Sequence, residues 1–545
     1  MLTLGLNAAF HDSAAVSVKE GVLLAAAEEK RSTRIKHAKR RVPFTACELP
    51  FHAIDWCQKQ PGATLADVDH VAYSFDPAQF TKNHEELHFL ERFTIEFPLC
   101  PGQEKTTTQA QWNNPWDPLF LIYIVNASEQ LRDGVYQSLG EAEVAHSFGL
   151  LYEQITTHLS FLHSSDEYKV MALAAMGEPL WASQLSEQVR LLGDGQFEIL
   201  PIDMTRLSGP PREPDSATLQ QHFELAASVQ KVLESKVLEL TQWLRQASGE
   251  RNLAMAGGVA LNCMMNSKLR DQGPFDSVWA QPAAGDASTA LGAAFWTDAR
   301  MRQGNSANNA SSNRVELTPS AWTQQHAYWG PFGEDDEIAE VLQWAGLAFE
   351  DCVDSQRLVE RTATLLERNA IVGWFQGCTE WGLRALGSRS ILASPVDPEM
   401  QTRLNKFKDR EDFRPAAPAV TIAAFYEWFS PSISEVGTSP FMLFTHQVLP
   451  RQVQRIPLAC HTDGSARVPT VQAQSHPRFH ALLQTMGQRT GVPVLVNTSF
   501  NVRGQPVVCS PKDALEAFFI PPLDSLVIGR FILTKPGFET VENRV

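Results

Sequence analysis

The sequence predicts an α/β protein of two domains. In each half of the chain, short apolar runs alternate with longer runs of helical periodicity, as in α/β folds. A polar stretch at residues 302–321 (RQGNSANNASSNRVELTPSA) separates the halves and is rich in turn-forming residues. Because 545 residues are too many for a single hydrophobic core, we expect one domain over residues 1–320 and a second over residues 328–545.

The expected elements of the first half follow from local patterns. Residues 2–10 (LTLGLNAAF) and 21–30 (GVLLAAAEEK) are strand-like runs, joined by a turn at residues 19–21. Residues 219–246 have helical periodicity and precede a short strand, LAMAG, at residues 253–257. The mixture of strands and helices is typical of an α/β domain.

The second half has the same mixture. Residues 336–346 (DEIAEVLQWAG), 354–369 (DSQRLVERTATLLERN) and 476–491 (HPRFHALLQTMGQRTG) have helical periodicity. Residues 370–377 (AIVGWFQG) and 493–500 (PVLVNTSF) are strand-like. A second α/β domain is therefore expected.

Composition and charge exclude several classes of protein. The formal net charge of −16 argues against a nucleic-acid partner, since phosphates would be repelled. No run of eighteen apolar residues is present, and the N-terminus lacks a signal-peptide pattern, so we expect a cytoplasmic protein without membrane association. The eight cysteines form no C-x-x-C pair, which predicts buried reduced thiols instead of disulfides or a thiolate zinc site.

A glycine pair marks the most informative motif of the first half, AMAGGVALNCMMNSKL. A strand is expected to end at Ala256, followed by Gly257, Gly258 and a helix. Glycines let a phosphate approach the backbone, and a helix N-terminus offers N–H groups to an anion. The motif predicts either a nucleotide site or a tight turn that only needs glycine. QPAAGDASTALGAAF repeats the arrangement, and Asp286 in it can cap the helix or ligate a metal.

Titratable residues follow the first expected strand. In AAFHDSAAV, His11 and Asp12 lie at the strand end, where α/β folds tend to keep their chemistry. His11 can accept a proton from an attacking hydroxyl, or it is an ordinary polar residue at a turn. Residues 28–41 (EEKRSTRIKHAKRR) concentrate cations and predict either a solvated face or an anion clamp.

Cations recur beside glycines and small residues in four segments of the second half: GWFQGCTEWGLRALGSRS, NKFKDREDFRPAAP, DGSARVPT and NTSFNVRGQP. Guanidinium groups bind phosphate oxygens two at a time, so several converging from separate loops suit a polyphosphate and a second anion. The cationic residues are Arg384, Arg389, Lys408, Arg410, Arg414, Arg467 and Arg503.

An H-E-x-x-H motif occurs in NHEELHFLERF at residues 83–93, with His84, Glu85 and His88 in the order used by zinc peptidases. No glycine and histidine follow at the metzincin spacing, and no glutamate-bearing second helix is evident. We therefore expect an exposed helix first, substitute metal ligands second and a peptidase last.

Taken together, these strings resemble the antibiotic-type O-carbamoyltransferases, which are related to the nodulation carbamoyltransferases. The resemblance rests on HDSAA, EEKRSTRIKHAK, GGVALNCMMN, PAAGDASTALGAA, VGWFQG, RALGSRS, FRPAAPAV, SPFMLFT, HTDGSARVPTV and VPVLVNTSFNVRGQP, in order and in both halves. It covers most of the chain outside residues 80–140. It implies an N-terminal actin-like ATPase-type domain, similar to the tRNA threonylcarbamoyl transferases, and a C-terminal domain similar to the threonylcarbamoyl-adenylate synthases.

The resemblance implies a reaction in two steps. Carbamoyl phosphate and ATP give carbamoyl-adenylate in the C-terminal domain. The carbamoyl group then passes, in the N-terminal domain, to a hydroxyl of a small-molecule acceptor such as an antibiotic or other secondary metabolite. By match to the family motifs, carbamoyl phosphate and ATP are bound by Lys408, Arg414, Met442, Arg467, Asn501 and Arg503.

The same match assigns residues to the transfer step. His11 is the expected base, Lys36 the lysine that steadies the anhydride, and Gly257, Gly258 and Asn262 the nucleotide-binding turn. ATP with Mg²⁺ is the expected cofactor.

The family's iron site is matched only in part. Its iron is held by an H-H-x-x-H stretch and by aspartates, of which the last is evident here as Asp286. H-H-x-x-H is absent from the sequence, so Fe²⁺ is left open, with His84 and His88 as substitute ligands. Two alternatives are also left open: a nucleotide-binding protein that has lost transfer activity with its metal ligands, and threonylcarbamoyl transfer to tRNA.

Overall fold

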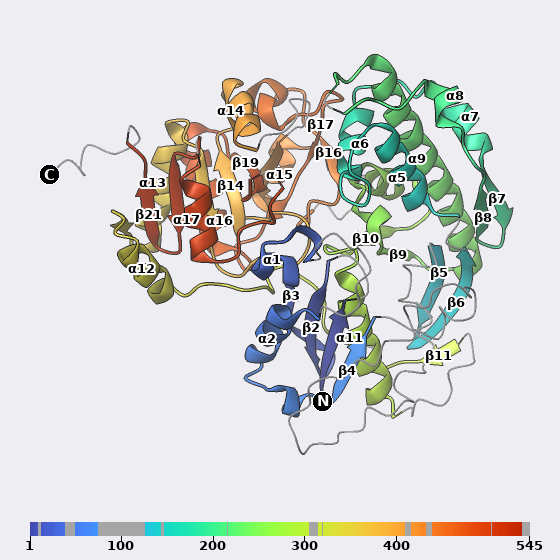
Figure 1. Ribbon diagram of the computed structural model, residues 1–545, viewed down its shortest axis with the longest axis horizontal. Helices are drawn as coiled ribbons and strands as arrows, with labels where there is room; N and C mark the ends of the chain where they lie inside the picture. Colours follow the sequence, from blue (N-terminus) through green and yellow to red (C-terminus); the bar gives the residue numbers. More distant parts are fainter. Residues whose placement is uncertain are drawn as a thin grey trace. The chain divides into compact units, whose positions relative to one another are not determined.

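Two compact units make up the described part of the chain in the computed structural model (Figure 1). Unit 1 comprises Met1–Val144 with Gly285–Thr323, and unit 2 comprises Ala145–Ala284 with Gln324–Val545. Residues 145–284 thus group with the C-terminal half, although the division at residues 320–328 remains our prediction for the domains. The structure describes residues 1–8, 12–38, 49–74, 126–142, 146–214, 216–304, 314–318, 320–408, 416–431, 439–502, 504–520 and 522–536.

Unit 1 is built on a four-stranded sheet with the strand order β3-β2-β1-β4. β1 pairs with β2 antiparallel and with β4 parallel, and β2 pairs with β3 antiparallel. The turn expected at residues 19–21 is confirmed, but it joins β3 to a strand, β2, that the sequence analysis does not predict. The strands are β1 (Leu2–Asn7), β2 (Ala14–Lys19), β3 (Val22–Glu28) and β4 (His70–Tyr73).

Helices pack against this sheet. Leu4 and Leu6 of β1 lie in one apolar cluster with Ile54 and Cys57 of α2. Gly5 of β1 packs against α11, where an added Cβ would lie 2.1 Å from the carbonyl oxygen of Ala290, so only glycine permits this approach. The helices are α1 (Glu29–Thr33), η1 (Lys36–Ala38), α2 (Phe51–Lys59), η2 (Leu65–Asp67) and α11 (Ser288–Arg302).

A second, three-stranded sheet of unit 1 has the strand order β11-β6-β5. β5 (Asn126–Arg132) and β6 (Val135–Ala142) form a hairpin, and β11 (Arg314–Glu316) pairs with β6. The polar stretch between the predicted domains therefore contains a strand. Three residues are too few to produce a recognisable alternation.

The first segment of unit 2 is arranged around the long helix α9 (Gln220–Ser248), with α5 and α6 alongside it (Figure 1). This helix confirms the periodicity seen in the sequence. Its apolar face, including Leu225, Val229 and Leu233, is buried. The other elements are α5 (Phe148–His158), α6 (Glu167–Ala174), α7 (Ala182–Glu187), β7 (Val189–Gly193), β8 (Gln196–Ile199), α8 (Met204–Ser208), β9 (Asn252–Met255), η4 (Gly258–Leu261), α10 (Cys263–Gln272) and β10 (Ser277–Ala280).

The second segment of unit 2 is an eight-stranded sheet with the order β12-β21-β20-β13-β14-β19-β15-β18. β13 pairs antiparallel with β14 and parallel with β20, so the sheet is mixed. The strands are β12 (Glu350–Asp351), β13 (Val372–Phe375), β14 (Arg389–Ala393), β15 (Ala417–Thr421), β18 (Thr470–Val471), β19 (Val494–Ser499), β20 (Ser525–Ile528) and β21 (Phe531–Thr534), while β16 (Thr445–Gln447) and β17 (Ser465–Arg467) form a separate pair.

Both faces of this sheet are covered by helices. Side chains of one face pack with α12, α14 and α17, and side chains of the other face pack with α13 and α16. Strands buried on both faces have continuous apolar runs, which explains the pattern of β13 and β19. The helices are α12 (Asp335–Trp344), α13 (Ser355–Glu367), α14 (Glu399–Lys408), α15 (Ile422–Trp428), η5 (Val453–Arg455), η6 (Pro457–Ala459), α16 (Pro477–Thr490) and α17 (Pro511–Phe518).

Two expectations drawn from composition can be compared with the described residues. No helix among them is long and apolar enough to cross a membrane. Six cysteines fall in these residues and all six are unbridged, and Cys57, Cys263, Cys352 and Cys509 are buried, as expected for reduced thiols.

Candidate functional site

Lys408, at the end of α14, is buried and holds two predicted site residues together. Its Nζ donates to the carbonyl oxygen of Asn501 at 2.8 Å and to the side-chain Oδ1 of Asn501 at 2.6 Å. It also donates to the carbonyl and hydroxyl oxygens of Ser499, the last residue of β19. Lys408 and Asn501, which are far apart in the sequence, therefore meet in the folded chain, while their role in substrate binding stays a prediction. These four acceptors are formally neutral, and together they orient the ammonium group.

Met442 and Arg467 belong to a second pair of segments. Met442 is buried with a left-handed backbone (φ 57°), and Thr445, three residues later, pairs with Arg467 in the β16–β17 ladder. The buried Nε of Arg467 has no hydrogen-bond partner among the described residues, which leaves a donor that suits an anion. The remaining two predicted binders, Arg414 and Arg503, lie outside the described residues.

The predicted nucleotide turn lies between β9 and α10. β9 ends at Met255, one residue earlier than expected, and the 3₁₀ turn η4 intervenes before α10 begins at Cys263. Gly257 has φ +90°, and a Cβ added at Gly257 or Gly258 would meet no atom within 4 Å. Glycine is thus required by the backbone only at Gly257. The open space over both residues permits close approach by a ligand.

Asn262 fixes the end of this turn. Its Oδ1 accepts from the backbone N–H of Met265 at 3.0 Å, which caps α10. The side-chain amides of Asn262 and Gln230 exchange hydrogen bonds of 2.8 and 3.1 Å, and the buried Tyr152 hydroxyl donates to Gln230 at 3.0 Å. Burial raises the pKa of Tyr152 well above its ordinary value, so it stays a neutral donor. Asn262 thus holds the turn in place, and its predicted role in nucleotide binding stays a prediction.

The RALGSRS segment is organised by a carboxylate that the sequence analysis does not identify. The buried Glu380 accepts from the backbone N–H groups of Leu386, Ser388 and Arg389 at 2.8, 2.8 and 3.1 Å. Arg384 donates to the carbonyl oxygen of Leu261, in the nucleotide turn, at 3.2 Å.

Arg389 does not act as a surface phosphate binder. It is fully buried, lies 3.6 Å from the centre of the Phe375 ring and donates to the carbonyl oxygens of Gln376 and Ser388 at 2.9 and 3.2 Å. Its guanidinium group is used to hold the main chain.

In unit 1, the cation-rich run forms a buried ion-pair network. Lys30 Nζ lies 2.9 Å from Asp12 Oδ1 and 2.8 Å from Glu28 Oε1, and Arg31 pairs with Glu28 at 2.9 Å. Burial alone would raise the pKa of Asp12, but the charge of Lys30 and hydrogen bonds from His37 and Lys30 hold it well below its ordinary value. Neither a solvated face nor an anion clamp describes Lys30 and Arg31.

Polar contacts connect Asp12 to the turn at Asp286. Asn7 donates to the carbonyl oxygen of Asp12 at 3.3 Å and accepts from Ser74 at 3.2 Å. The Thr289 hydroxyl lies 2.9 Å from the Ser74 hydroxyl and 2.8 Å from the carbonyl oxygen of Asp286, and it donates its single proton to one of these two acceptors. The segments around Asp12 and Asp286, which the family match assigns to the transfer step, are therefore connected through the side chains of Asn7, Ser74 and Thr289.

The other predicted residues of the transfer step are less defined. Lys36 is exposed in η1, whereas His11, His84 and His88 lie outside the described residues. Among the residues that are described, no group of three or more His, Cys, Asp or Glu side chains is placed to hold a metal ion. Iron at Asp286 therefore remains a prediction from the family match, and we assign no chemical step to it.

Comparison with known proteins identifies the family. The model described as Carbamoyltransferase N-terminus matches residues 2–95 and 123–295, and that described as Carbamoyltransferase C-terminus matches residues 363–535. An uncharacterized protein of Synechocystis sp. is 32% identical, with 98% of this chain and 96% of the relative covered. Nodulation protein NolNO of Sinorhizobium fredii is 33% identical, with 97% of this chain and 80% of the relative covered. The chain belongs to the carbamoyltransferase family. It is a transferase, as the sequence analysis predicts.

The likeness of this carbamoyltransferase to the solved structure of a dehydratase activator is weak. The activator of the 2-hydroxyisocaproyl-CoA dehydratase from Clostridium difficile, solved with bound ADPNP, aligns with a TM-score of 0.26 and 11% identity, covering 56% of this chain and 97% of that chain. So low a score supports no conclusion about a shared fold. The α/β class is confirmed by the structure, whereas the actin-like N-terminal domain and the likeness of the C-terminal domain to threonylcarbamoyl-adenylate synthases remain predictions.

The residues that sequence reasoning does not find in this carbamoyltransferase share one property: Ser499, Glu380 and Gln230 hold other protein groups in place. Ser499 lies inside the motif VPVLVNTSFNVRGQP, beside Asn501, so its position in a matched motif is a usable signal. Gln230 is a polar residue on the buried face of a helix. Because buried polar groups are normally hydrogen-bonded, such a position indicates that a hydrogen-bond partner lies nearby. Glu380 has no comparable local signal.

Proposed function

We propose that this carbamoyltransferase is an ATP-dependent O-carbamoyltransferase that forms carbamoyl-adenylate and transfers its carbamoyl group to a hydroxyl of a small-molecule acceptor. Membership of the carbamoyltransferase family supports transfer of a carbamoyl group. The hydroxyl acceptor follows from the resemblance to the O-carbamoyltransferases. The adenylate intermediate and an antibiotic or other secondary metabolite as acceptor are parts of the proposal.

The observation on which the proposal chiefly rests is the meeting of Lys408 with Asn501. The reaction has to hold carbamoyl phosphate and the phosphates of ATP together, and such anions need cations that are oriented in advance. Lys408 is oriented by Ser499 and Asn501 through neutral oxygen atoms. Arg467 offers a buried donor with no described partner. Arg414 and Arg503 complete the set by their match to the family motifs.

The first step balances as two displacements. Water releases phosphate from carbamoyl phosphate and leaves carbamate. A carbamate oxygen then attacks the α-phosphorus of ATP, and pyrophosphate leaves as the P–O bond to it breaks. In this step the cations bind and orient the two substrates and stabilise the charge on the departing phosphates. Mg²⁺ is expected to accompany the ATP phosphates.

The second step uses the predicted nucleotide turn. The adenylate's nucleotide part would lie over Gly257 and Gly258, where an added Cβ would meet no atom within 4 Å. The acceptor oxygen attacks the carbonyl carbon, the bond to the AMP oxygen breaks, and the hydroxyl proton passes to a base, for which His11 is the predicted residue. Lys36 is proposed to steady the anhydride.

The proposal is tested by giving the full-length protein ATP, Mg²⁺ and carbon-13 carbamoyl phosphate, with Fe²⁺ added or withheld and no acceptor present. We expect labelled carbamoyl-adenylate by mass spectrometry, and pyrophosphate release that depends on carbamoyl phosphate. If neither product forms under either condition, the proposed chemistry is wrong and a nucleotide-binding role without transfer activity is favoured.

A further inference from the structure

Three residues on α10 hold the chain segment 443–446. Asn266, fully buried, donates to the carbonyl oxygen of Leu443 at 3.1 Å. The hydroxyl of Ser267 accepts from the backbone N–H and the hydroxyl of Thr445 at 2.7 and 3.0 Å. Arg270 donates to the carbonyl oxygen of Thr445 at 3.0 Å. We call Asn266, Ser267 and Arg270 the α10 clamp.

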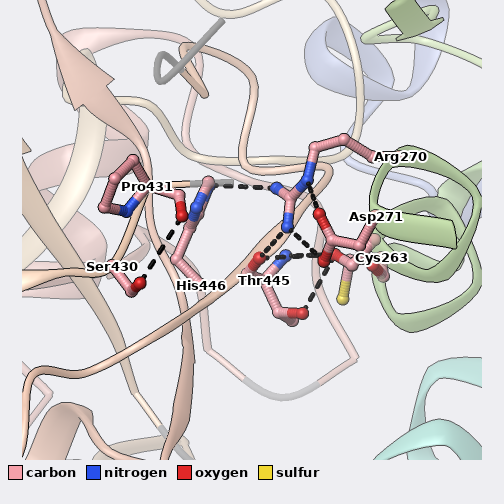
Figure 2. Close-up of polar contacts among 8 residues, drawn as sticks. Cys263, Arg270, Asp271, Ser430, Pro431, Thr445 and His446 are labelled. Carbon is pink, nitrogen blue, oxygen red and sulfur yellow. Dashed lines mark hydrogen bonds and ion pairs between the residues drawn. The ribbon is translucent and has the colours of Figure 1, made fainter. Parts of the chain in front are cut away.

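The neighbouring His446 adds to this contact. Arg270 NH1 lies 3.4 Å from its Nε2, with Asp271 pairing the same guanidinium group at 2.8 Å (Figure 2). Burial, followed by the charge of Arg270, lowers the pKa of His446 to about 3, so its ring is neutral and Nε2 can accept from Arg270. The Arg270 guanidinium also lies 5.3 Å from the centre of the Phe444 ring. The clamp thus contacts both main-chain and side-chain atoms of the segment 443–446.

The clamped segment is adjacent to two predicted carbamoyl phosphate residues. It begins directly after Met442, and its residue Thr445 is the strand partner of Arg467. Movement of the segment relative to α10 would therefore displace Met442 along the chain and Arg467 across the ladder.

The predicted nucleotide turn directly precedes the N-terminus of α10. Asn262 caps the helix, and the same Asn266 amide that holds Leu443 also donates to the carbonyl oxygen of Ala260 inside the turn at 2.8 Å. Met255, which precedes the turn, and Leu261, which lies within it, pack against the apolar cluster that contains Met442 and Leu443. One short helix and one cluster thus contact both predicted binding regions of unit 2.

We propose that the α10 clamp is a positioning device that couples nucleotide binding at Gly257–Asn262 to carbamoyl phosphate binding at Met442 and Arg467. A nucleotide that orders the turn would favour one position of α10, and the clamp would transmit that position to the segment after Met442. Coupling of this kind is reciprocal, since each ligand changes the affinity for the other by the same factor. This inference rests on the proposed function for the identity of the two ligands.

The test is calorimetric titration of the full-length protein with carbamoyl phosphate, in the absence and presence of saturating AMP. In the unmodified protein we expect AMP to tighten carbamoyl phosphate binding by about 5-fold or more, the lower end of typical coupling factors. In the double variant Asn266→Ala with Ser267→Ala, the effect of AMP should fall below about 2-fold. An equal effect of AMP in both proteins, or no effect in the unmodified protein, would overturn the inference.

Three further variants sharpen this test. Ser267→Ala alone removes one hydroxyl and should reduce the effect of AMP even where the double variant is too unstable to study. Gln452→Ala is the matched control, because its buried side-chain amide likewise donates to a backbone carbonyl, that of Glu427 at 2.9 Å, away from the clamp; it should retain the full effect. Gly258→Val fills the space over the turn and should abolish the effect; if AMP still acts in this variant, it binds elsewhere and the inference is wrong.

Pyrophosphate release by the same proteins separates this inference from the proposed function. Release that depends on carbamoyl phosphate, without coupling to AMP, rejects only the clamp. Coupling without any release supports the clamp and rejects the carbamoyl-adenylate mechanism.

Discussion

Lys30 in unit 1 and Lys408 in unit 2 are both buried, but their ammonium groups contact different kinds of oxygen atom. Lys30 lies against two carboxylates, Asp12 and Glu28, at 2.9 and 2.8 Å. Lys408 donates to carbonyl, hydroxyl and amide oxygens of Ser499 and Asn501, none of which has a formal charge. The first arrangement neutralises a cation to hold a loop in place. The second orients an ammonium group through hydrogen bonds to neutral oxygen atoms.

The comparison separates two kinds of buried cation, one paired with carboxylates and one hydrogen-bonded to neutral oxygen atoms. The sequence presents the two lysines alike, each in a basic run beside acidic residues. What differs is the chemistry of the atoms that each ammonium group contacts. Substitution should therefore damage stability in unit 1 and catalysis in unit 2.

The largest expected effect is on stability, at Lys30. Lys30→Met leaves Asp12 and Glu28 buried without their shared cation, which typically costs about 3–5 kcal/mol. Denaturant unfolding of the variant beside Lys19→Met, an exposed lysine of the same unit, measures this cost. A free energy of unfolding equal to that of the control would show that the network is not stabilising.

The next effect is on activity, at Lys408. Lys408→Met removes an oriented cation, and we expect carbamoyl phosphate-dependent pyrophosphate release to fall about 100-fold or more. The free energy of unfolding should change by only about 1–3 kcal/mol, the cost of leaving polar partners unsatisfied. Lys406→Met, on the exposed side of the same helix, is the matched control. A stability loss with unchanged pyrophosphate release would place Lys408 with the structural cations instead.

A third effect concerns the dependence of stability on pH. His446 is neutral in the folded protein, where its pKa is lowered to about 3, whereas the unfolded chain takes up a proton near pH 6.5. Stability is therefore lost as the pH falls below about 6.5, by up to 1.4 kcal/mol for each pH unit.

In the variant His446→Gln, the number of protons taken up on unfolding in acid should fall by up to one, so stability should depend less steeply on pH. Unfolding at pH 7, 6 and 5 measures the slope for both proteins. Identical slopes would mean that His446 does not remain neutral when the protein is folded. His476, whose pKa burial lowers to about 4, should continue to contribute in the variant.

The smallest effect distinguishes the two glycines of the nucleotide turn. Gly257→Ala should cost about 1 kcal/mol of unfolding free energy, because φ is +90° there. At Gly258 an added Cβ meets no atom and φ is not positive. The free energy of unfolding of Gly258→Ala should therefore change by no more than about 0.5 kcal/mol. Thermal unfolding of both variants tests this, and equal losses would contradict the assigned backbone conformations.

Local patterns predict the elements that are long or strongly apolar. α9, α13 and α16 follow from helical periodicity, and β13 and β19 follow from continuous apolar runs. β2 does not follow, because its residues AAVSVK include alanine and serine, which favour strands weakly, and burial on both faces removes any alternation.

The sequence predicts which residues belong to the candidate site, but it does not predict which of them contact each other. Matched motifs identify Lys408 and Asn501, yet only the folded chain brings them together. Glu380 and Gln230 bind protein groups in place of a ligand, and residues of this kind follow no local spacing rule. The roles of His11, Lys36, Arg414 and Arg503 remain predictions from the family match.

In the proposed reaction, adenylate formation and carbamoyl transfer use different residues. The most direct measurement is the yield of labelled carbamoyl-adenylate from carbon-13 carbamoyl phosphate and ATP by Lys408→Met, His11→Ala and unmodified protein, without acceptor. We predict a yield near that of the unmodified protein for His11→Ala and a yield reduced about 100-fold or more for Lys408→Met. Equal losses in both variants, or an undiminished yield from Lys408→Met, would contradict the account.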